Sequence, residues 1–411
     1  MTNKRFSFTR RFFLVQGLAL LAGCRSLSDL PTLPFLGRDD EGNASLLNVG
    51  GEVAEIKTTN DWRFMAVRAR TRLGGASSPD GGEELRLGTN LSLYNIEFQR
   101  PLPCPDYGLD AFENPTALAF TPKAEACYVV SGVSAREPRA GSVAVDRVPL
   151  APPKKGNPEP LHLEDSSWID ALLSPSGDWL AVQTKEGAWS FRDLSADPIK
   201  EVCFPETYRP KSEERETHVG RVLAISPDGK LAAALMAPRP GSGEEQNQTI
   251  AIWDLSTARS IPIEKAKKLP LEALFVSEFH IRDNAAGRIC AFSHDGQMLA
   301  VRNKQKYVGI WQTAGGKILA EFGEHRQPVT ALQFTPNNAK LVVGTGENFG
   351  RLLIWDVRKG RLLRTYNDPA KESRKITAIQ VSPDGNLVYF GNDRGNINQW
   401  EYQSTSETKK S

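Results

Sequence analysis

One pattern of apolar runs and tight turns occurs three times in succession between Arg288 and Tyr402, and it restricts the fold more than any other feature of the chain. Each copy has an apolar run, a turn, a second apolar run and a third run that ends near a Trp. The three turns are residues 293–296 (Ser-His-Asp-Gly), 335–338 (Thr-Pro-Asn-Asn) and 382–385 (Ser-Pro-Asp-Gly). Self-similarity with a period of about 40–50 residues indicates a repeat architecture.

Four more copies precede these three. A clear one has the turn 226–229 (Ser-Pro-Asp-Gly), and three diverged copies lie around residues 169–191, 116–146 and 53–95. The second run of each copy is apolar almost without interruption, as expected for an interior strand that is covered on both faces. The copies therefore predict seven four-stranded units. Residues 269–283 also contain strand-like apolar residues, which we assign to a connection, and six or eight units are the alternatives.

The copies resemble the WD-repeat family of β-propellers, in which each repeat supplies one four-stranded blade and a Trp-Asp pair closes the third strand. The pair is intact at Trp253-Asp254 and Trp355-Asp356 and is altered at Trp311-Gln312 and Trp400-Glu401. The family's Gly-His pair survives as Glu324-His325, and the resemblance implies that His325 forms a hydrogen bond within its blade. The predicted fold is therefore all-β, a single seven-bladed β-propeller over residues 44–402.

The two ends of this region predict how the ring closes. The last copy ends at Tyr402, before a fourth strand could form, whereas residues 45–49 (Ser-Leu-Leu-Asn-Val) precede the first copy without a partner. We expect residues 45–49 to form the outermost strand of the last blade, because this pairing protects an open edge. Residues 403–411 contain no apolar side chain to bury and are expected to be disordered.

Residues 1–23 have the pattern of a signal peptide, with a basic segment that ends at Arg10 and Arg11 and an apolar run over 12–22. Leu-Ala-Gly-Cys at 21–24 resembles the bacterial lipoprotein box, which implies cleavage before Cys24 and lipidation of its thiol. An ordinary signal peptide with an incidental Cys24 is the alternative. Thr-Arg-Arg-Phe-Phe at 9–13 resembles the twin-arginine export signal, with general secretion as the alternative route. Residues 24–43 lack periodicity and predict a flexible linker.

These resemblances imply a lipid-anchored protein of the bacterial cell envelope that faces the periplasm. Arg25 follows the lipidated cysteine, and the absence of Asp there favours the outer membrane where one is present. The chain has a formal net charge of +2, and its first 23 residues contain four bases and no acid, so the remainder is close to neutral. A near-neutral protein has no electrostatic attraction for nucleic acid, which we exclude as a partner.

The predicted strand order places nearly every long insertion on one face of the propeller, which we call the long-loop face. We call the opposite face, which carries the tight turns between first and second strands, the turn face. We expect it to be uniformly compact. The insertions are Thr71–Asn90, Pro101–Pro115, Val133–Gly141, Ala151–Ser167, Pro205–Thr217 and Ala237–Thr249. Because loops on rigid scaffolds often bind partners, this face is the predicted binding surface, with unselected surface growth as the alternative.

No pattern predicts a catalytic residue, a metal ligand or a cofactor-binding site. The five histidines are not spaced as metal ligands, and no Gly-x-Ser-x-Gly elbow or phosphate-binding glycine loop is present. Cys203 and Cys290 lie in strand patterns and are predicted to be small buried side chains. A disulfide between Cys104 and Cys127 is left open, because export permits it without requiring it.

The predicted function is therefore a non-catalytic protein-interaction scaffold. The expected partners are envelope proteins, bound through the long-loop face, and the membrane, reached through the N-terminal lipid. Two other functions are compatible with the sequence: a propeller hydrolase or lactonase with a metal in the central channel, and an envelope receptor for a small ligand or glycan.

Overall fold

A computed structural model describes much of the region predicted to form the propeller. The described residues are 44–49, 51–77, 83–96, 100–102, 115–131, 143–150, 162–165, 168–184, 189–196, 199–204, 207–208, 217–238, 248–260, 274–281, 289–304, 306–323, 325, 327–346, 350–367 and 375–402. The predicted signal peptide with Arg10 and Arg11, the linker with Cys24, and the tail at 403–411 lie outside these residues.

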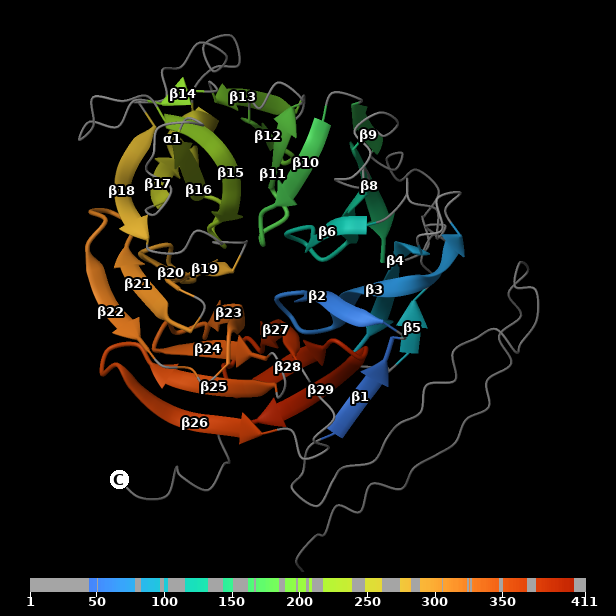
Figure 1. The fold of residues 1–411 in the computed structure, drawn as a ribbon. Coiled ribbons are helices and arrows are strands. Elements are labelled where there is room, and N and C mark those ends of the chain that lie inside the picture. The colour runs from blue at the N-terminus through green and yellow to red at the C-terminus, as the bar shows by residue number, and fades with distance from the viewer. Residues whose placement is uncertain are drawn as a thin grey trace, which may run out of the picture. The chain divides into compact units, whose positions relative to one another are not determined.

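Antiparallel sheets form the seven blades of the ring, as the repeats predicted (Figure 1). From the innermost to the outermost strand, the blades are: β2 Glu52–Thr58, β3 Phe64–Ser77, β4 Glu83–Asn95 and β5 Arg100–Leu102 in blade 1; β6 Pro115–Phe120, β7 Ala126–Ser131, β8 Val143–Pro149 and β9 His162–Asp165 in blade 2; β10 Trp168–Leu173, β11 Trp179–Thr184, β12 Trp189–Asp193 and β13 Lys200–Phe204 in blade 3; β15 Thr217–Ile225, β16 Leu231–Pro238, β17 Gln248–Asp254 and β18 Phe275–Ile281 in blade 4; β19 Cys290–Phe292, β20 Met298–Arg302, β21 Val308–Gln312 and β22 Ile318–Phe322 in blade 5; β23 Val329–Phe334, β24 Lys340–Thr345, β25 Arg351–Asp356 and β26 Arg361–Asn367 in blade 6; β27 Ile376–Val381, β28 Leu387–Asn392, β29 Asn396–Glu401 and β1 Ala44–Asn48 in blade 7.

Two short elements add to this plan in blade 4. Strand β14 (Thr207–Tyr208) pairs with the first residues of β15, and helix α1 (Leu255–Ser260) follows β17. Innermost strands of neighbouring blades contact one another around the whole ring, from β2 through β6, β10, β15, β19, β23 and β27 back to β2. No helix among the described residues is long and apolar enough to cross a membrane.

The first strand of the described chain completes the last blade. Strand β1 pairs antiparallel with β29, from Ala44 opposite Gln399 to Asn48 opposite Asn396, which confirms the predicted closure with a shift of one residue at each end. The seam between blades 7 and 1 is tightly packed, since a Cβ atom on Gly391 would lie 2.3 Å from a methyl carbon of Val53. In the same seam Trp62 stacks on Tyr389, with ring centroids 4.9 Å apart.

Aromatic side chains of the repeats fill the spaces between blades. Trp311 of β21 stacks on Phe279 of blade 4 at 4.8 Å, and Trp355 of β25 stacks on Phe322 of blade 5 at 5.0 Å. Both pairs therefore join an outer strand of one blade to the third strand of the next blade. Full burial of a large apolar side chain contributes about 1.5–3 kcal/mol, so repetition of this contact stabilises the whole ring.

The turns between first and second strands are built by the residues that defined the repeat. In blade 4, Ser226 Oγ accepts hydrogen bonds from the backbone N–H groups of Lys230 and Leu231. Gly229 has φ of 68°, a left-handed conformation that glycine adopts without strain. The Ser and Gly of the turn signature are thus backbone requirements, and they do not form a reaction site.

Four expectations about connections are wrong. Residues 162–165, expected within the insertion 151–167 of the long-loop face, form the outermost strand β9 of blade 2. Residues 71–77 and 83–90 were expected in a loop, but they extend β3 and β4 as a hairpin, with Thr71 opposite Gly88 and Ser77 opposite Glu83. Residues 275–281, expected in a connection, form the outer strand β18 of blade 4, because their backbone groups pair with β17. The turn face is not uniformly compact either, since α1 and residues up to 274 connect β17 to β18 there.

We expect that removal of β1 weakens the whole ring. A chain that begins at residue 50 lacks the backbone hydrogen bonds between β1 and β29, each of which contributes about 1 kcal/mol, and it exposes the edge of β29. Its free energy of unfolding should be lower by about 3 kcal/mol than that of a chain beginning at residue 44, as measured by urea denaturation. Equal urea midpoints for the two chains would show that β1 does not stabilise the ring.

Candidate functional site

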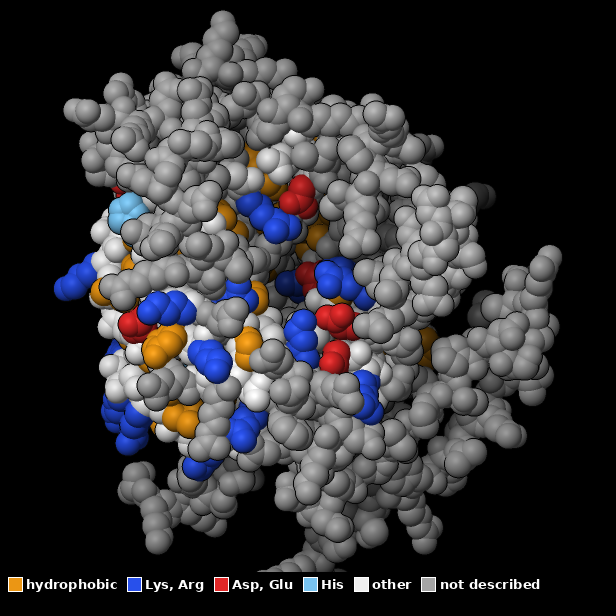
Figure 2. Space-filling model, in the orientation of Figure 1, with side chains coloured by type: hydrophobic (Ala, Val, Ile, Leu, Met, Phe, Trp, Pro, Cys, Tyr) orange, Lys and Arg blue, Asp and Glu red, His pale blue; other side chains and the backbone are white. Residues whose placement is uncertain are grey.

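Charged side chains of both signs surround the inner strands. Lys375 and Glu52 link blades 7 and 1 with an Nζ–Oε1 distance of 3.8 Å, and Arg221 and Asp170 link blades 4 and 3 with an Nε–Oδ2 distance of 3.5 Å. Figure 2 shows acidic and basic side chains together around the middle of the visible face. Because the charges are paired, this region does not attract ligands of one sign, and such partly exposed pairs contribute about 0–1 kcal/mol each.

The described residues contain no group of three or more His, Cys, Asp or Glu side chains that could hold a metal ion. His280 is exposed and its Nδ1 lies 3.0 Å from Thr249 Oγ1, while His294 lies in the turn after β19. Cys127 is completely buried, with its Sγ 3.5 Å from the carbonyl oxygen of Tyr128, and Cys290 is half-buried. Cys104 lies outside the described residues, so its disulfide with Cys127 stays a hypothesis.

The most densely bonded polar cluster lies on the turn face between blades 3 and 4. Arg259 of α1 donates from Nη2 to Asp178 Oδ2 at 2.7 Å and from Nε to Asp193 Oδ2 at 2.8 Å. Its guanidinium also lies over the ring of Trp179, 4.9 Å from the centroid. Both carboxylates belong to blade 3, so Arg259 ties the helix of one blade to its neighbour.

A lysine of blade 3 completes this contact from the other direction. Lys200 Nζ donates to the carbonyl oxygens of Ala258 and Arg259 at 2.8 and 2.7 Å. These are carbonyl groups at the C-terminal end of α1, where the helix cannot satisfy them itself. Leu255, Ala258 and Leu274 are buried in one apolar cluster with Trp179. The helix is therefore a cover for the junction between blades 3 and 4.

The electrostatics of the cluster favour ionised Asp178. Burial alone would raise the pKa of this carboxyl, but hydrogen bonds from Ser176, Arg259 and Ser174 together with the charge of Arg259 lower the pKa below its ordinary value. Burial lowers the pKa of Lys200. The aspartate and the arginine act as a partly buried ion pair, which stabilises the packing of α1 and offers no free group for catalysis.

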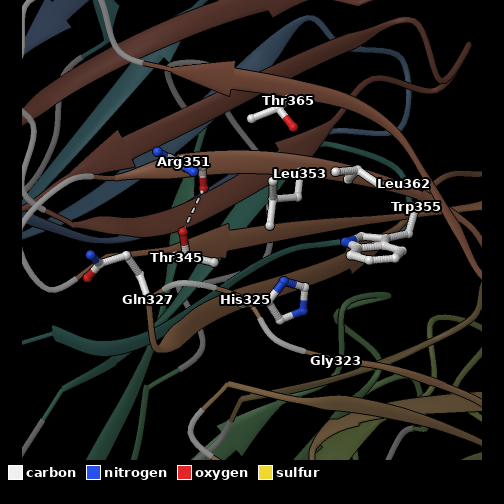
Figure 3. A pocket seen from close by; sticks show the side chains of 9 residues that line it. All are labelled: Gly323, His325, Gln327, Thr345, Arg351, Leu353, Trp355, Leu362 and Thr365. Carbon is white, nitrogen blue, oxygen red and sulfur yellow. Dashed lines mark hydrogen bonds between the residues drawn. The ribbon is translucent and has the colours of Figure 1, made fainter.

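A pocket of about 340 Å³ opens between blades 5 and 6 (Figure 3). Its walls come from the segment after β22 and from β24, β25 and β26. The residues that line it are Gly323, His325, Gln327, Thr345, Arg351, Leu353, Trp355, Leu362 and Thr365. We call it the rim pocket, because Leu362 and Thr365 belong to the outermost strand of blade 6.

Two ring nitrogens at the rim pocket have no hydrogen-bond partner among the described residues, His325 Nε2 and Trp355 Nε1. His325 is 4% exposed and meets Trp355 edge-on, with centroids 5.5 Å apart, and burial lowers its pKa to about 4. The hydrogen bond expected for the imidazole within its blade is therefore not formed by Nε2. The histidine packs against the tryptophan ring and is neutral at pH 7.

The other predicted repeat positions lie in third strands: Trp253 and Asp254 in β17, Trp311 in β21, Trp355 and Asp356 in β25, and Trp400 in β29. Asp254 Oδ1 accepts hydrogen bonds from the backbone N–H groups of Ser256 and Thr257, so it is the N-cap of α1. Asp356 Oδ1 accepts from the N–H of Lys359 in the turn before β26. The aspartates thus form local backbone caps. Sequence analysis missed Arg259, Lys200 and the rim pocket, although Asp254-Leu-Ser-Thr contains a helix-start signal.

Replacement of Arg259 by Met should lower the free energy of unfolding at pH 7 by about 2 kcal/mol, between the values for exposed and buried ion pairs. The side chains of Asp193 and Asp178 are 3% and 12% exposed and would lose their cation, whereas Arg259 is 38% exposed. Because the pKa of Asp178 is lower in the folded state, its ionisation stabilises the fold when the pH is above the ordinary aspartate pKa of about 4. This contribution to the free energy of unfolding disappears as the pH falls through the folded-state pKa.

The difference between wild type and Arg259→Met should therefore shrink below about pH 4, as measured by urea denaturation at several pH values. Arg358→Met, at an exposed arginine in the turn after β25, is the matched control and should leave the midpoint unchanged. Equal effects of the two substitutions would contradict a specific role of Arg259.

Comparison with known proteins finds a match to one family model over a short part of the chain. The model of the WD domain, G-beta repeat, matches residues 316–356. The chain is 26% identical over 188 residues to target of rapamycin complex subunit wat1 of Schizosaccharomyces pombe, which covers 46% of this chain and 50% of that protein. It is 32% identical over 97 residues to eukaryotic translation initiation factor 3 subunit I of Aspergillus terreus, which covers 24% of this chain and 27% of that protein.

A third relative, periodic tryptophan protein 2 homolog of Dictyostelium discoideum, is 30% identical over 28% of this chain and 12% of its own length. The chain thus spans half or less of these relatives. Among solved structures, the Cps50 (Swd1) β-propeller domain of Myceliophteria thermophila has a TM-score of 0.53 at 14% identity, covering 86% of this chain and 97% of that domain. The repeat match and the shared fold support a WD-repeat propeller, in agreement with the Trp-Asp pairs in the sequence.

Proposed function

We propose that this protein is a non-catalytic scaffold of the bacterial cell envelope, anchored by a lipid on Cys24, that binds other envelope proteins through its long-loop face. The observation that carries the proposal is the hairpin of β3 and β4. These strands have 14 and 13 residues, whereas β24 and β25 of blade 6 have six each. Strand β2 pairs with β3 only as far as Arg70, so residues 71–77 and 83–88 form a two-stranded ribbon beyond the blade.

A ribbon of this kind is a suitable contact element. Its two strands pair by backbone hydrogen bonds from Thr71 opposite Gly88 to Ser77 opposite Glu83, so its backbone is ordered by the hairpin itself. The ring below it is closed and packed at every junction between innermost strands. Binding to such a preformed element costs less ordering entropy than binding to a flexible loop of the same length.

The relatives agree with a role in protein assemblies. Two of them are named as subunits, one of a target of rapamycin complex and one of a translation initiation factor. We transfer only the general property, participation in a complex, to this chain. The location in a bacterial envelope is supported by the leader sequence alone, through Arg10, Arg11 and the Leu-Ala-Gly-Cys box that ends at Cys24.

Replacement of Cys24 by Ser should release the protein from membranes, because the lipid attached to its thiol is the proposed anchor. The measurement is the share of protein that stays with membranes after a high-salt wash, together with the mass of the N-terminal peptide. Cys290→Ser, at a half-buried cysteine of β19, is the matched control and should stay membrane-bound. Retention of the Cys24→Ser protein in the membrane fraction would exclude this anchor.

Shortening the long-loop face should abolish capture of partner proteins. In the test variant, Asn-Gly replaces residues 72–87 between the paired residues Thr71 and Gly88, and a second Asn-Gly replaces residues 237–248 between Met236 and Thr249. Cross-linked membranes are solubilised, and proteins that purify with wild type and variant are compared by mass spectrometry.

The control for this capture is Lys123→Ala, at an exposed residue of the turn between β6 and β7 on the opposite face. Partners found with wild type and control but absent from the shortened variant would support the scaffold and locate its surface. If wild type and shortened variant retain the same proteins, the long-loop face is not the binding surface.

A further inference from the structure

We propose that the rim pocket binds a carboxylate of an acidic, extended segment of a partner protein, which lies along the open edge of β26. The pocket is lined by the β22–β23 connection, by the ends of β24 and β25 and by β26, on blades 5 and 6. It does not involve the β3–β4 hairpin of blade 1, which carries the function proposed above. The proposal rests on four properties of blades 5 and 6: the origin of the pocket, its unpaired donors, the charge around it and the open strand edge beside it.

The pocket exists because the outer strands of the two blades differ in length. Strand β22 has five residues and ends at Phe322, while β26 has seven. The next residue of blade 5, Gly323, lacks a side chain, and a Cβ atom there would lie 2.5 Å from the ring of Tyr307. The pocket lies beyond the end of β22, where Leu353 and Thr365, which pair with each other across β25 and β26, are part of its wall.

The polar groups of the pocket match an anionic acceptor. No described residue forms an ion pair with the guanidinium of Arg351, and Trp355 Nε1 has no acceptor. His325 Nε2 is buried without a partner, and the neutral imidazole can donate from this atom (Figure 3). A buried donor without an acceptor destabilises the protein by about 1–3 kcal/mol. A carboxylate that enters the pocket would neutralise the arginine, and it is the kind of acceptor that the two ring nitrogens lack.

The surface around the pocket is positively charged. Arg358, Lys359, Arg361 and Arg364 are all exposed in the turn before β26 and along this strand. The single acid between residues 351 and 366 is Asp356, whose carboxylate already accepts a backbone hydrogen bond from Lys359. Figure 2 shows hydrophobic side chains interspersed with Lys and Arg where β22 to β26 lie. This pattern favours an acidic partner, since complementary charge accelerates association and excludes basic sequences.

The shape of the surface favours a peptide over a small anion. Among the described residues, strand β26 pairs with β25 on one side and is the last strand of its sheet, so an extended segment can add to its other edge by backbone hydrogen bonds. Leu362 of β26 is 44% exposed at the pocket, and Ile318 and Leu319 of the neighbouring outer strand are 48% and 49% exposed. Aliphatic side chains of a peptide would cover such residues, whereas a small anion would leave them in water.

The test uses the full chain, panned with a phage-displayed library of random nonapeptides in parallel with three variants. Arg351→Gln removes the unpaired cation, and Leu362→Ser removes the exposed aliphatic contact. Arg70→Gln, at an exposed arginine of blade 1, is the matched control. Wild type and Arg70→Gln should enrich peptides that combine Asp or Glu with aliphatic residues, and Arg351→Gln should not. Urea midpoints of all variants show whether each is folded.

The affinity of the most enriched peptide is then measured by fluorescence anisotropy. We expect Arg351→Gln to weaken binding about tenfold or more, as loss of a charge-assisted hydrogen bond does, and Leu362→Ser to weaken it several-fold. A peptide with Asn or Gln in place of its acids should bind wild type as weakly as the acidic peptide binds Arg351→Gln. Combining the neutral peptide with Arg351→Gln should not weaken binding further, because the peptide carboxylate and the arginine contact each other.

Three outcomes would overturn the proposal. They are enrichment of the same peptides by wild type and Arg351→Gln, absence of acidic peptides from the enriched set, and recruitment to anionic phospholipid vesicles that depends on Arg351 while no peptide binds. The variant with a shortened β3–β4 hairpin should bind the peptide as wild type does. The rim pocket and the β3–β4 hairpin are thus tested independently.

Discussion

The pairing of β1 with β29 is the constraint on which the rest of the structure depends. Each blade is covered on both faces by its neighbours, so a ring that fails to close exposes two blade faces and the edge of β29 at once. The seam has its own packing, through Trp62 on Tyr389 and through Val53 against the backbone of Gly391. Every surface feature of the protein is therefore held by a contact between residues more than 300 positions apart in the sequence.

In a closed ring, the space between neighbouring blades widens toward the outer strands. This chain fills two of these spaces differently. Between blades 3 and 4, α1 inserts Leu255 and Ala258 into the apolar cluster, and Arg259 pairs with carboxylates of the neighbouring blade. Between blades 5 and 6, the short strand β22 and Gly323 leave the rim pocket. A junction between blades that is filled by side chains stabilises the ring. A junction that leaves a pocket with unpaired donors can bind a ligand.

The sequence predicted those parts of the fold that depend on local backbone chemistry. Turn signatures such as Ser226 to Gly229, and the Trp near the end of the third strand in blades 4 to 7, located the blades, because their spacing follows from one four-stranded unit per repeat. Outer strands such as β18 were missed, since a strand with one face in water has a weak apolar pattern. The ribbon beyond Arg70 resembled a loop, because its glycines and charges do not follow the apolar alternation of a strand with one buried face.

The candidate sites could not be predicted in the same way. They depend on distances between segments of neighbouring blades, and the repeat pattern is the same for every blade, so it does not show where such distances differ. Sequence analysis predicted a hydrogen bond within the blade for His325 and a place at the end of the third strand for Trp355, and the structure places the two rings in contact. Their unpaired nitrogens become visible only when the length of β22 and the position of Arg351 are known. The repeat residues of one blade can thus serve both packing and binding. A ring nitrogen that forms no hydrogen bond with a neighbouring residue can bind a partner where the junction between two blades is not filled.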